Sequence, residues 1–144
     1  MSPDTLFSIA STVAFLGWLA LIFLPKPWRY KVPIALCAPA LALLYAVMIF
    51  PALKGINPAA FSTLDGIMAL QGSKLAALVG WVHYLAFDLI VGWVIANDAE
   101  RQGLNRWTMI PALLLTFMLG PVGWLTYLVI RLVSKRGFVV RWQN

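Results

Sequence analysis

The chain has 144 residues, of which 62% are hydrophobic and 11% are charged, and its formal net charge is +6. Soluble domains are about 45–50% apolar and about 25% charged, so this composition indicates a membrane protein and excludes an ordinary soluble domain. In a membrane protein the basic excess favours contact with anionic lipid headgroups over binding of nucleic acid. Cys37 is the only cysteine, which excludes an intramolecular disulfide and a CxxC metal site.

Four apolar runs are long enough to cross a membrane as helices, because a hydrocarbon core of about 30 Å requires about 20 residues. The runs comprise residues 5–24, 32–53, 75–96 and 109–133. Lipid offers the backbone no hydrogen bonds and the runs show no alternation of period 2, so we expect α-helices. The predicted fold is all-α: a four-helix transmembrane bundle that forms one domain over residues 1–144, with a basic tail at residues 134–144.

The first run has no basic residue before it and is longer than the roughly 7–15 residues of a signal-peptide core, so we expect a retained span. The chain also has no transit extension rich in Arg and Ser, which favours a bacterial inner membrane over an organelle. The link at residues 25–31 is short, so the first two helices should be antiparallel neighbours. Cys37 in the second run is interpreted as a small apolar filler.

The link at residues 54–74 contains the sequence FSTLDGIMAL. Its Ser62 and Asp65 form an S-x-x-D helix start, and apolar residues follow at near-helical spacing. This pattern predicts a short amphipathic helix that lies on the membrane surface or closes the bundle like a lid.

Loop charge does not set the orientation of a four-span chain. Both termini would share one side, with six basic residues there and five on the other. We expect both termini in the cytoplasm. The basic residues of that side are Lys54, Lys74, Arg131, Lys135, Arg136 and Arg141.

The third run contains the only histidine and an aspartate. His83 and Asp88 lie near mid-depth, where an ionisable group costs at least about 2.5 kcal/mol and normally faces the bundle interior. The two are about 140° apart around a helix, so we do not expect them to bond each other. Three residues share the face of Asp88: Trp81, Tyr84 and Gly92. Two interpretations stay open, an interior hydrogen-bonding role that joins helices and an acid–base site in an apolar cavity. His83 could also supply one axial ligand to a haem or chlorophyll.

The fourth run contains the sequence LGPVGW. Pro121 removes the hydrogen bond to the carbonyl of Phe117, which predicts a kink. Gly120 and Gly123 allow close helix approach, and Thr116 can bond locally. The kink is either a packing feature or the opening of a cavity for a lipid-like molecule.

The stretches GWVHYLAFDLIVGWVIANDAERQGL and IPALLLTFMLGPVGWLTYLVIR resemble the abscisic-acid-deficient-four-like family. The shared positions are Trp81, His83, Asp88, Asp98, Gly103, Thr116, Gly120, Pro121 and Gly123. Plant members of this family act in forming neoxanthin, an allenic xanthophyll, from the epoxide violaxanthin. The resemblance implies an integral membrane protein that acts on or binds a carotenoid-like isoprenoid, as an isomerase similar to neoxanthin synthase.

Such an isomerisation needs an acid and a base in a water-poor cavity and requires no cofactor. The candidate catalytic residues are Asp88 as base or charge stabiliser, His83 as acid, and Tyr84. The candidate ligand-binding residues are Trp81, Gly92, Thr116 and Pro121, and no metal site is expected.

A second function stays open: a non-catalytic subunit of a larger membrane assembly, such as a pigment–protein complex, with other membrane subunits as partners. A transporter or channel is disfavoured, because neither inverted repeats nor a row of pore-lining charges is visible.

Overall fold

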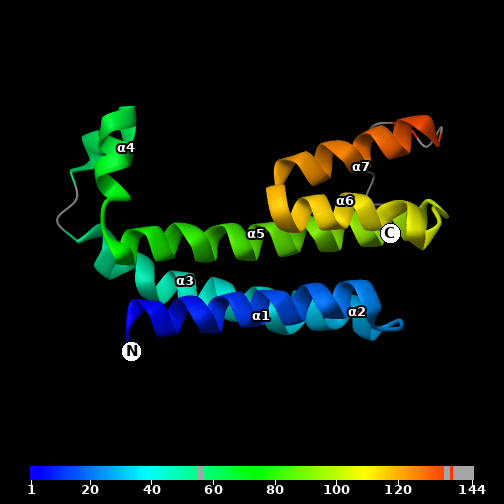
Figure 1. The fold of residues 1–144 in the computed structure, drawn as a ribbon, viewed down its shortest axis with the longest axis horizontal. Coiled ribbons are helices and arrows are strands. Elements are labelled where there is room, and N and C mark those ends of the chain that lie inside the picture. Colours follow the sequence, from blue (N-terminus) through cyan, green and yellow to red (C-terminus); the bar gives the residue numbers. More distant parts are fainter. Residues whose placement is uncertain (55–56, 135–136, 138–144) are drawn as a thin grey trace.

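The computed structural model of the protein describes residues 1–54, 57–134 and 137, and this part of the chain is all-helical, as predicted. Its elements are α1 (Pro3–Phe23), α2 (Trp28–Val32), the π-helical turn η1 (Pro33–Cys37), α3 (Ala38–Leu53), the 3-10 helix η2 (Pro58–Ser62), α4 (Leu64–Leu70), α5 (Lys74–Arg101), α6 (Arg106–Leu119) and α7 (Pro121–Val133). Three segments are long and apolar enough to cross a membrane: α1, the continuous stretch Trp28–Leu53, and α5. They correspond to the first three predicted spans (Figure 1).

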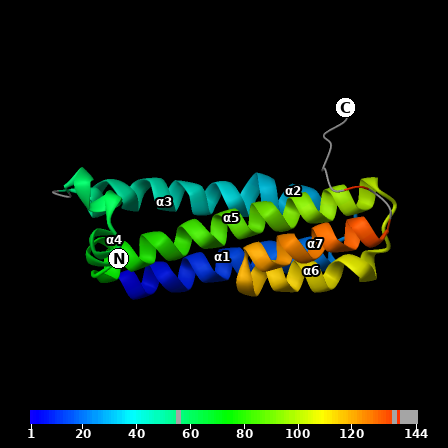
Figure 2. The ribbon, with the colours of Figure 1, turned by 90° about the horizontal axis from the view of Figure 1, so that it is seen from above.

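The predicted fourth span, residues 109–133, is not one helix. The chain reverses at Gly120, and α6 and α7 lie side by side as an antiparallel hairpin along the second half of α5 (Figures 1 and 2). At 14 and 13 residues, each helix reaches only about 20 Å, short of a hydrocarbon core of about 30 Å. The four-span prediction is therefore corrected to three helices long and apolar enough to cross a membrane and a shorter hairpin, which turns beside the middle of α5 and returns to the end of the bundle from which it came.

The reversal has a local cause in the sequence LGPVG. Gly120 has φ +49° and ψ −100°, a backbone conformation that side chains with a Cβ rarely adopt. Pro121 follows as the first residue of α7, where its missing N–H breaks no helical bond. A Cβ on Gly123 would overlap the backbone nitrogen and Oγ1 of Thr116, so this glycine lets α7 lie directly on α6. The residues that predicted a kink thus produce a complete turn.

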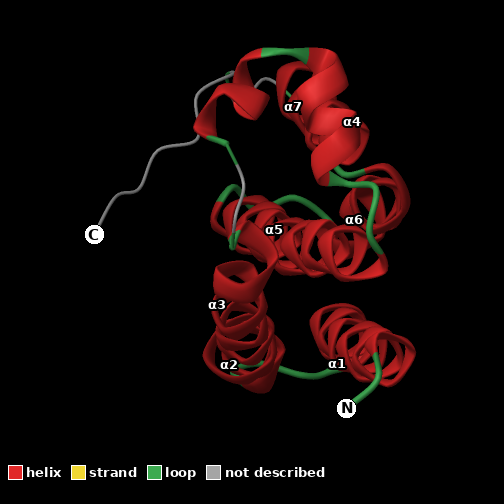
Figure 3. Cartoon of the chain, turned by 90° about the vertical axis from the view of Figure 1, so that its left-hand side faces the viewer, coloured by secondary structure: helices red, strands yellow, loops and turns green. Residues whose placement is uncertain are grey.

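Helix α5 is the centre of the fold, with α1 and α3 on one side and the hairpin on the other (Figure 3). Small residues let α1 approach it closely: Ala10 and Ala14 are fully buried, and a Cβ on Gly17 would lie 2.7 Å from Leu89 Cδ2. In return, Gly92 of α5 makes room for the indole ring of Trp18. Close packing of small residues is what holds helices together where lipid is as apolar as the protein.

The second span contains a π-helical turn that begins at Pro33. Pro33 has no N–H, so the helical bond to the carbonyl of Arg29 is missing at this point. The N–H of Ala38 bonds to the carbonyl of Pro33, five residues back rather than four, which widens this turn. Before this turn, α2 and the link that precedes it are held to the last turn of α5. Lys26 of the link forms an ion pair with Glu100, and the hydroxyl of Tyr30 in α2 donates to the same carboxylate.

The predicted amphipathic helix between the second and third spans is present as α4. Its N-cap is Thr63, whose Oγ1 accepts from Gly66 N at 3.1 Å, rather than Ser62. In Figure 1, α4 runs crosswise to α5 at the end of the bundle that contains the N-terminus. Ile67 packs toward the bundle, whereas Leu64 and Met68 are exposed on the outside.

The first helix begins at one end of the bundle, and α7 ends at the opposite end (Figure 1). The predicted placement of both ends on one side followed from four spans, so it does not hold for the described part of the chain. Of the predicted tail at residues 134–144, only Ser134 and Gly137 are among the described residues.

Candidate functional site

A cavity of about 460 Å³ lies where the tip of the hairpin meets α5; we call it the Asp88 pocket. Its lining residues are His83, Tyr84, Phe87, Asp88, Val91 and Val94 from α5 and Gly120, Pro121 and Trp124 from the hairpin. Four residues predicted for the site therefore lie together: His83, Tyr84, Asp88 and Pro121. The lining is predominantly apolar and aromatic with a few polar groups, as in most small-molecule sites.

Asp88 stands at the middle of α5, half-buried, with its carboxylate against the turn of the hairpin. A Cβ on Gly120 would lie 2.8 Å from Asp88 Oδ1, so the glycine both forms the turn and makes room for the carboxylate. Within residues 1–54 and 57–134, no hydrogen bond or ion pair to this carboxylate is found. Two effects act on it in opposite directions: the partial positive charge at the N-terminus of α7 favours a negative carboxylate, and the apolar lining disfavours it. A carboxyl group in this balance is suited to exchanging a proton.

His83 forms part of an aromatic wall of the same pocket. Its ring centroid lies 4.6 Å from that of Phe87, 5.5 Å from that of Tyr45 on α3 and 6.1 Å from that of Tyr84. No hydrogen bond joins His83 to Asp88 in the part of the chain that the structure describes, in line with their separation around the helix. The two groups can therefore act on different atoms of one bound molecule.

Three other residues predicted for the site lie outside the lining of the Asp88 pocket. Trp81 donates from Nε1 to Ser11 Oγ at 3.2 Å and lines a separate pocket of about 310 Å³ between α1 and α5. Gly92 lies under Trp18, and Thr116 is buried inside the hairpin, where its Oγ1 donates to the carbonyl of Ala112 at 2.8 Å. The last two contribute to helix packing.

A buried polar cluster that the sequence analysis did not predict lies next to the pocket. Asp98, Tyr127 and Arg131 are 4%, 0% and 1% exposed. The hydroxyl of Tyr127 donates to Asp98 Oδ2, and Arg131 Nε lies 3.3 Å from the same oxygen. The Tyr127 ring also packs on Trp124 of the pocket, with centroids 6.0 Å apart. The cluster fixes α7 to the second half of α5, beyond Trp124 of the pocket.

A signal for this cluster was present in the sequence. Tyr127 and Arg131 are one helical turn apart inside an apolar run, so they share a face. A guanidinium in such a run needs an acidic partner inside the bundle. A straight fourth span would carry Arg131 to the membrane surface, and for that reason the four-span prediction counts it as a loop charge.

The described residues contain no group of three or more His, Cys, Asp or Glu that could hold a metal ion.

The model of one protein family, described as ABA DEFICIENT 4-like, matches residues 5–127, which is most of the chain. The chain belongs to the ABA DEFICIENT 4-like family. This confirms the family predicted from the sequence. In this ABA DEFICIENT 4-like protein the match takes in α1 from Thr5, the other two helices that are long enough to cross a membrane, the Asp88 pocket and the hairpin as far as Tyr127. No curated protein and no solved structure matches the chain.

Proposed function

We propose that this chain binds a carotenoid-like isoprenoid in the Asp88 pocket and isomerises it without a cofactor. The observation that carries the proposal is the Asp88 carboxylate, half-buried at the middle of α5, facing the pocket and without a hydrogen bond among the described residues. An intramembrane carboxylate with a purely structural role has a partner, as Asp98 has in Tyr127 and Arg131. A polar group that forgoes a partner costs free energy, which favours a role toward a bound molecule.

The pocket suits a long apolar molecule that arrives through the lipid. Tyr84 and Phe87 line it and are 62% and 56% exposed, so its flank is reached from the membrane without passing through water. Aromatic rings on both sides, from Phe87 on α5 and Trp124 on α7, offer flat surfaces against which a rigid polyene can pack. Membership in the ABA DEFICIENT 4-like family supports the same class of ligand, because its plant members act in neoxanthin formation.

The proposed reaction opens an epoxide to an allene. A base removes a proton from a carbon of the polyene, the adjacent electrons form the new double bond, and the carbon–oxygen bond of the epoxide breaks. An acid gives a proton to the departing oxygen, which becomes a hydroxyl group. Atoms and electrons balance without an oxidant. In this scheme Asp88 is the base and His83 the acid, with Tyr84 as a neighbouring hydroxyl donor.

The test measures conversion and bound pigment in the protein purified in mild detergent. Bound polyene should give structured absorption in the blue, and Asp88→Asn should abolish conversion of an epoxy-carotenoid without lowering the free energy of unfolding. Asp65→Asn, an exposed change on α4, is the matched control and should convert normally. Full conversion by Asp88→Asn would refute the assignment. A colourless, inactive protein that purifies with other membrane subunits would instead support the role of an assembly subunit.

A further inference from the structure

We infer that the Asp88 pocket is loaded from one membrane leaflet only, the leaflet at the N-terminal end of α5, and that this is the non-cytoplasmic leaflet. The inference rests on the proposed binding function, but it concerns the route by which an apolar molecule reaches the pocket. Three observations support it: the hairpin covers only half of α5, a buried polar cluster lies behind the pocket, and the two ends of the bundle differ in charge.

The hairpin covers only the second half of α5. The helix is about 42 Å long, and Asp88 lies 14 residues, or about 21 Å, from Lys74. Beyond Asp88, α5 is covered by its neighbours, and Ile95, Ala96 and Ala99 are fully buried. Before Asp88, a stretch of α5 between α4 and the hairpin tip has no helix over it (Figures 1 and 2). We call this stretch the notch; Trp81, Tyr84 and Phe87 are its exposed large side chains.

The surroundings of α5 differ on the two sides of Asp88. Toward the C-terminal end of the helix, Trp124 lines the pocket, and beyond it the buried Tyr127 and the Asp98–Arg131 pair fill the space between α5 and α7. Toward the N-terminal end, the exposed side chains of Tyr84 and Phe87 are followed by Trp81. Trp81 lines the second pocket, of about 310 Å³, together with Lys74 and Asp4. An apolar molecule can therefore enter through the notch, from the leaflet that surrounds it.

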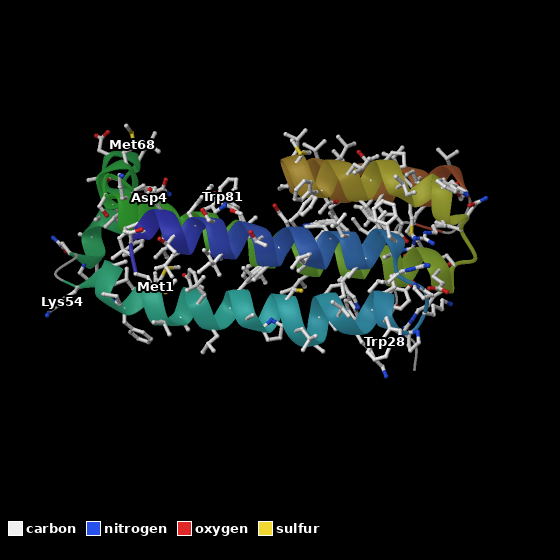
Figure 4. All side chains as sticks on the ribbon, turned by 60° about the horizontal axis from the view of Figure 1, so that its bottom comes forward. Met1, Asp4, Trp28, Lys54, Met68 and Trp81 are labelled. Atoms are coloured by element: carbon white, nitrogen blue, oxygen red, sulfur yellow. The ribbon has the colours of Figure 1, made fainter. Side chains whose placement is uncertain are left out.

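The charges assign that leaflet to a side of the membrane. With three spans and a re-entrant hairpin, Lys54 and Lys74 lie at the end that contains the N-terminus, and Figure 4 shows Lys54 and Trp28 at opposite ends of the bundle. Five basic residues lie at the other end: Lys26, Arg29, Lys31, Arg101 and Arg106. Arg131 is buried against Asp98 and does not count as a loop charge. Because basic loops are retained in the cytoplasm, the end near Trp28 faces the cytoplasm and the notch opens to the opposite leaflet.

The first experiment tests the orientation. In a Cys37→Ala background, Ser62→Cys and Gln102→Cys place one thiol at each end of the bundle. A membrane-impermeant maleimide added to intact spheroplasts should label Ser62→Cys strongly and should label Gln102→Cys only after permeabilisation. The reverse pattern would overturn the assignment to the non-cytoplasmic leaflet.

The second experiment tests the route. The protein is reconstituted in vesicles in known orientation, and a phosphatidylcholine with a photoactivatable acyl chain is exchanged into one leaflet. Cross-links to the segment of residues 81–87 should be several-fold more frequent when the probe is in the leaflet at the Ser62 end. Equal cross-linking from both leaflets would overturn the inference. So would a cross-linked dimer of this chain, because the notch would then be covered by a second copy.

A blocking variant sharpens this measurement. Ala77 is exposed and lines the second pocket beside Trp81, so Ala77→Leu fills part of the notch. It should lower cross-linking to residues 81–87 several-fold, whereas Ala40→Leu, on the exposed face of α3, should leave it unchanged. An unchanged yield in Ala77→Leu would contradict loading through the notch. None of these readouts requires conversion, so a failure of the proposed isomerase activity at Asp88 would be seen separately.

Discussion

Replacing Asp98 by Asn should detach the hairpin from α5. Arg131 is 1% exposed and its Nε lies 3.3 Å from Asp98 Oδ2, so the variant would leave the guanidinium buried without its carboxylate. Removing one member of a buried ion pair costs about 3–5 kcal/mol. Since 1.4 kcal/mol is a factor of ten, the equilibrium constant for unfolding should rise roughly 10²- to 10⁴-fold. Asp98→Asn combined with Arg131→Met should cost less than the sum of the two single changes, because no uncompensated buried charge remains.

The assay is reversible unfolding in mixed detergent micelles, followed by tryptophan fluorescence, with limited proteolysis in the link between α5 and α6 to report detachment. Asp65→Asn on the exposed face of α4 is the control and should change the free energy of unfolding by less than about 0.5 kcal/mol. A loss of less than about 1 kcal/mol in Asp98→Asn would refute the reasoning, since the pair would not then be what holds α7 to α5.

Three further changes test the packing around the pocket by the same unfolding measurement. Gly120→Ala should cost about 1–3 kcal/mol, because φ is +49° and the new Cβ would meet the Asp88 carboxylate; no loss would mean that the turn is formed differently. Gly92→Leu should cost about 1–3 kcal/mol through its clash with Trp18, whereas a leucine at a position with open space should not destabilise. Glu100→Gln should cost less than about 1 kcal/mol, and the loss should shrink at high salt; a large loss that salt does not change would contradict a surface ion pair.

Hydropathy predicted where the long apolar helices lie in the sequence but not the reversal of the chain within the last apolar run. The first three spans were predicted within a few residues, because about 20 consecutive apolar residues have few other solutions. The run at residues 109–133 satisfied the same criterion, yet Gly120 reverses it. Whether LGPVG gives a kink or a turn depends on φ at Gly120 and on what α7 packs against, which is Asp98 of a different helix.

The candidate site, too, was predicted only in part from the sequence. The sequence placed His83, Tyr84 and Asp88 on one helix near mid-depth, and the structure places all three in the lining of one pocket. Periodicity could not show that Pro121 and Trp124 would form the opposite wall. That wall exists only because the hairpin folds back onto α5.

The hairpin also makes the two halves of the bundle unequal in width. The half near the N-terminus contains the three segments long enough to cross a membrane, α1, the stretch Trp28–Leu53 and α5, and in the other half α6 and α7 lie beside them. Each helix with its side chains is about 10 Å across, so the cross-section widens toward the end that holds the α5–α6 link. In a membrane, a protein with this wedge shape fits best where the bilayer is curved. In a flat bilayer, the surrounding lipids must fill the space beside the narrower half.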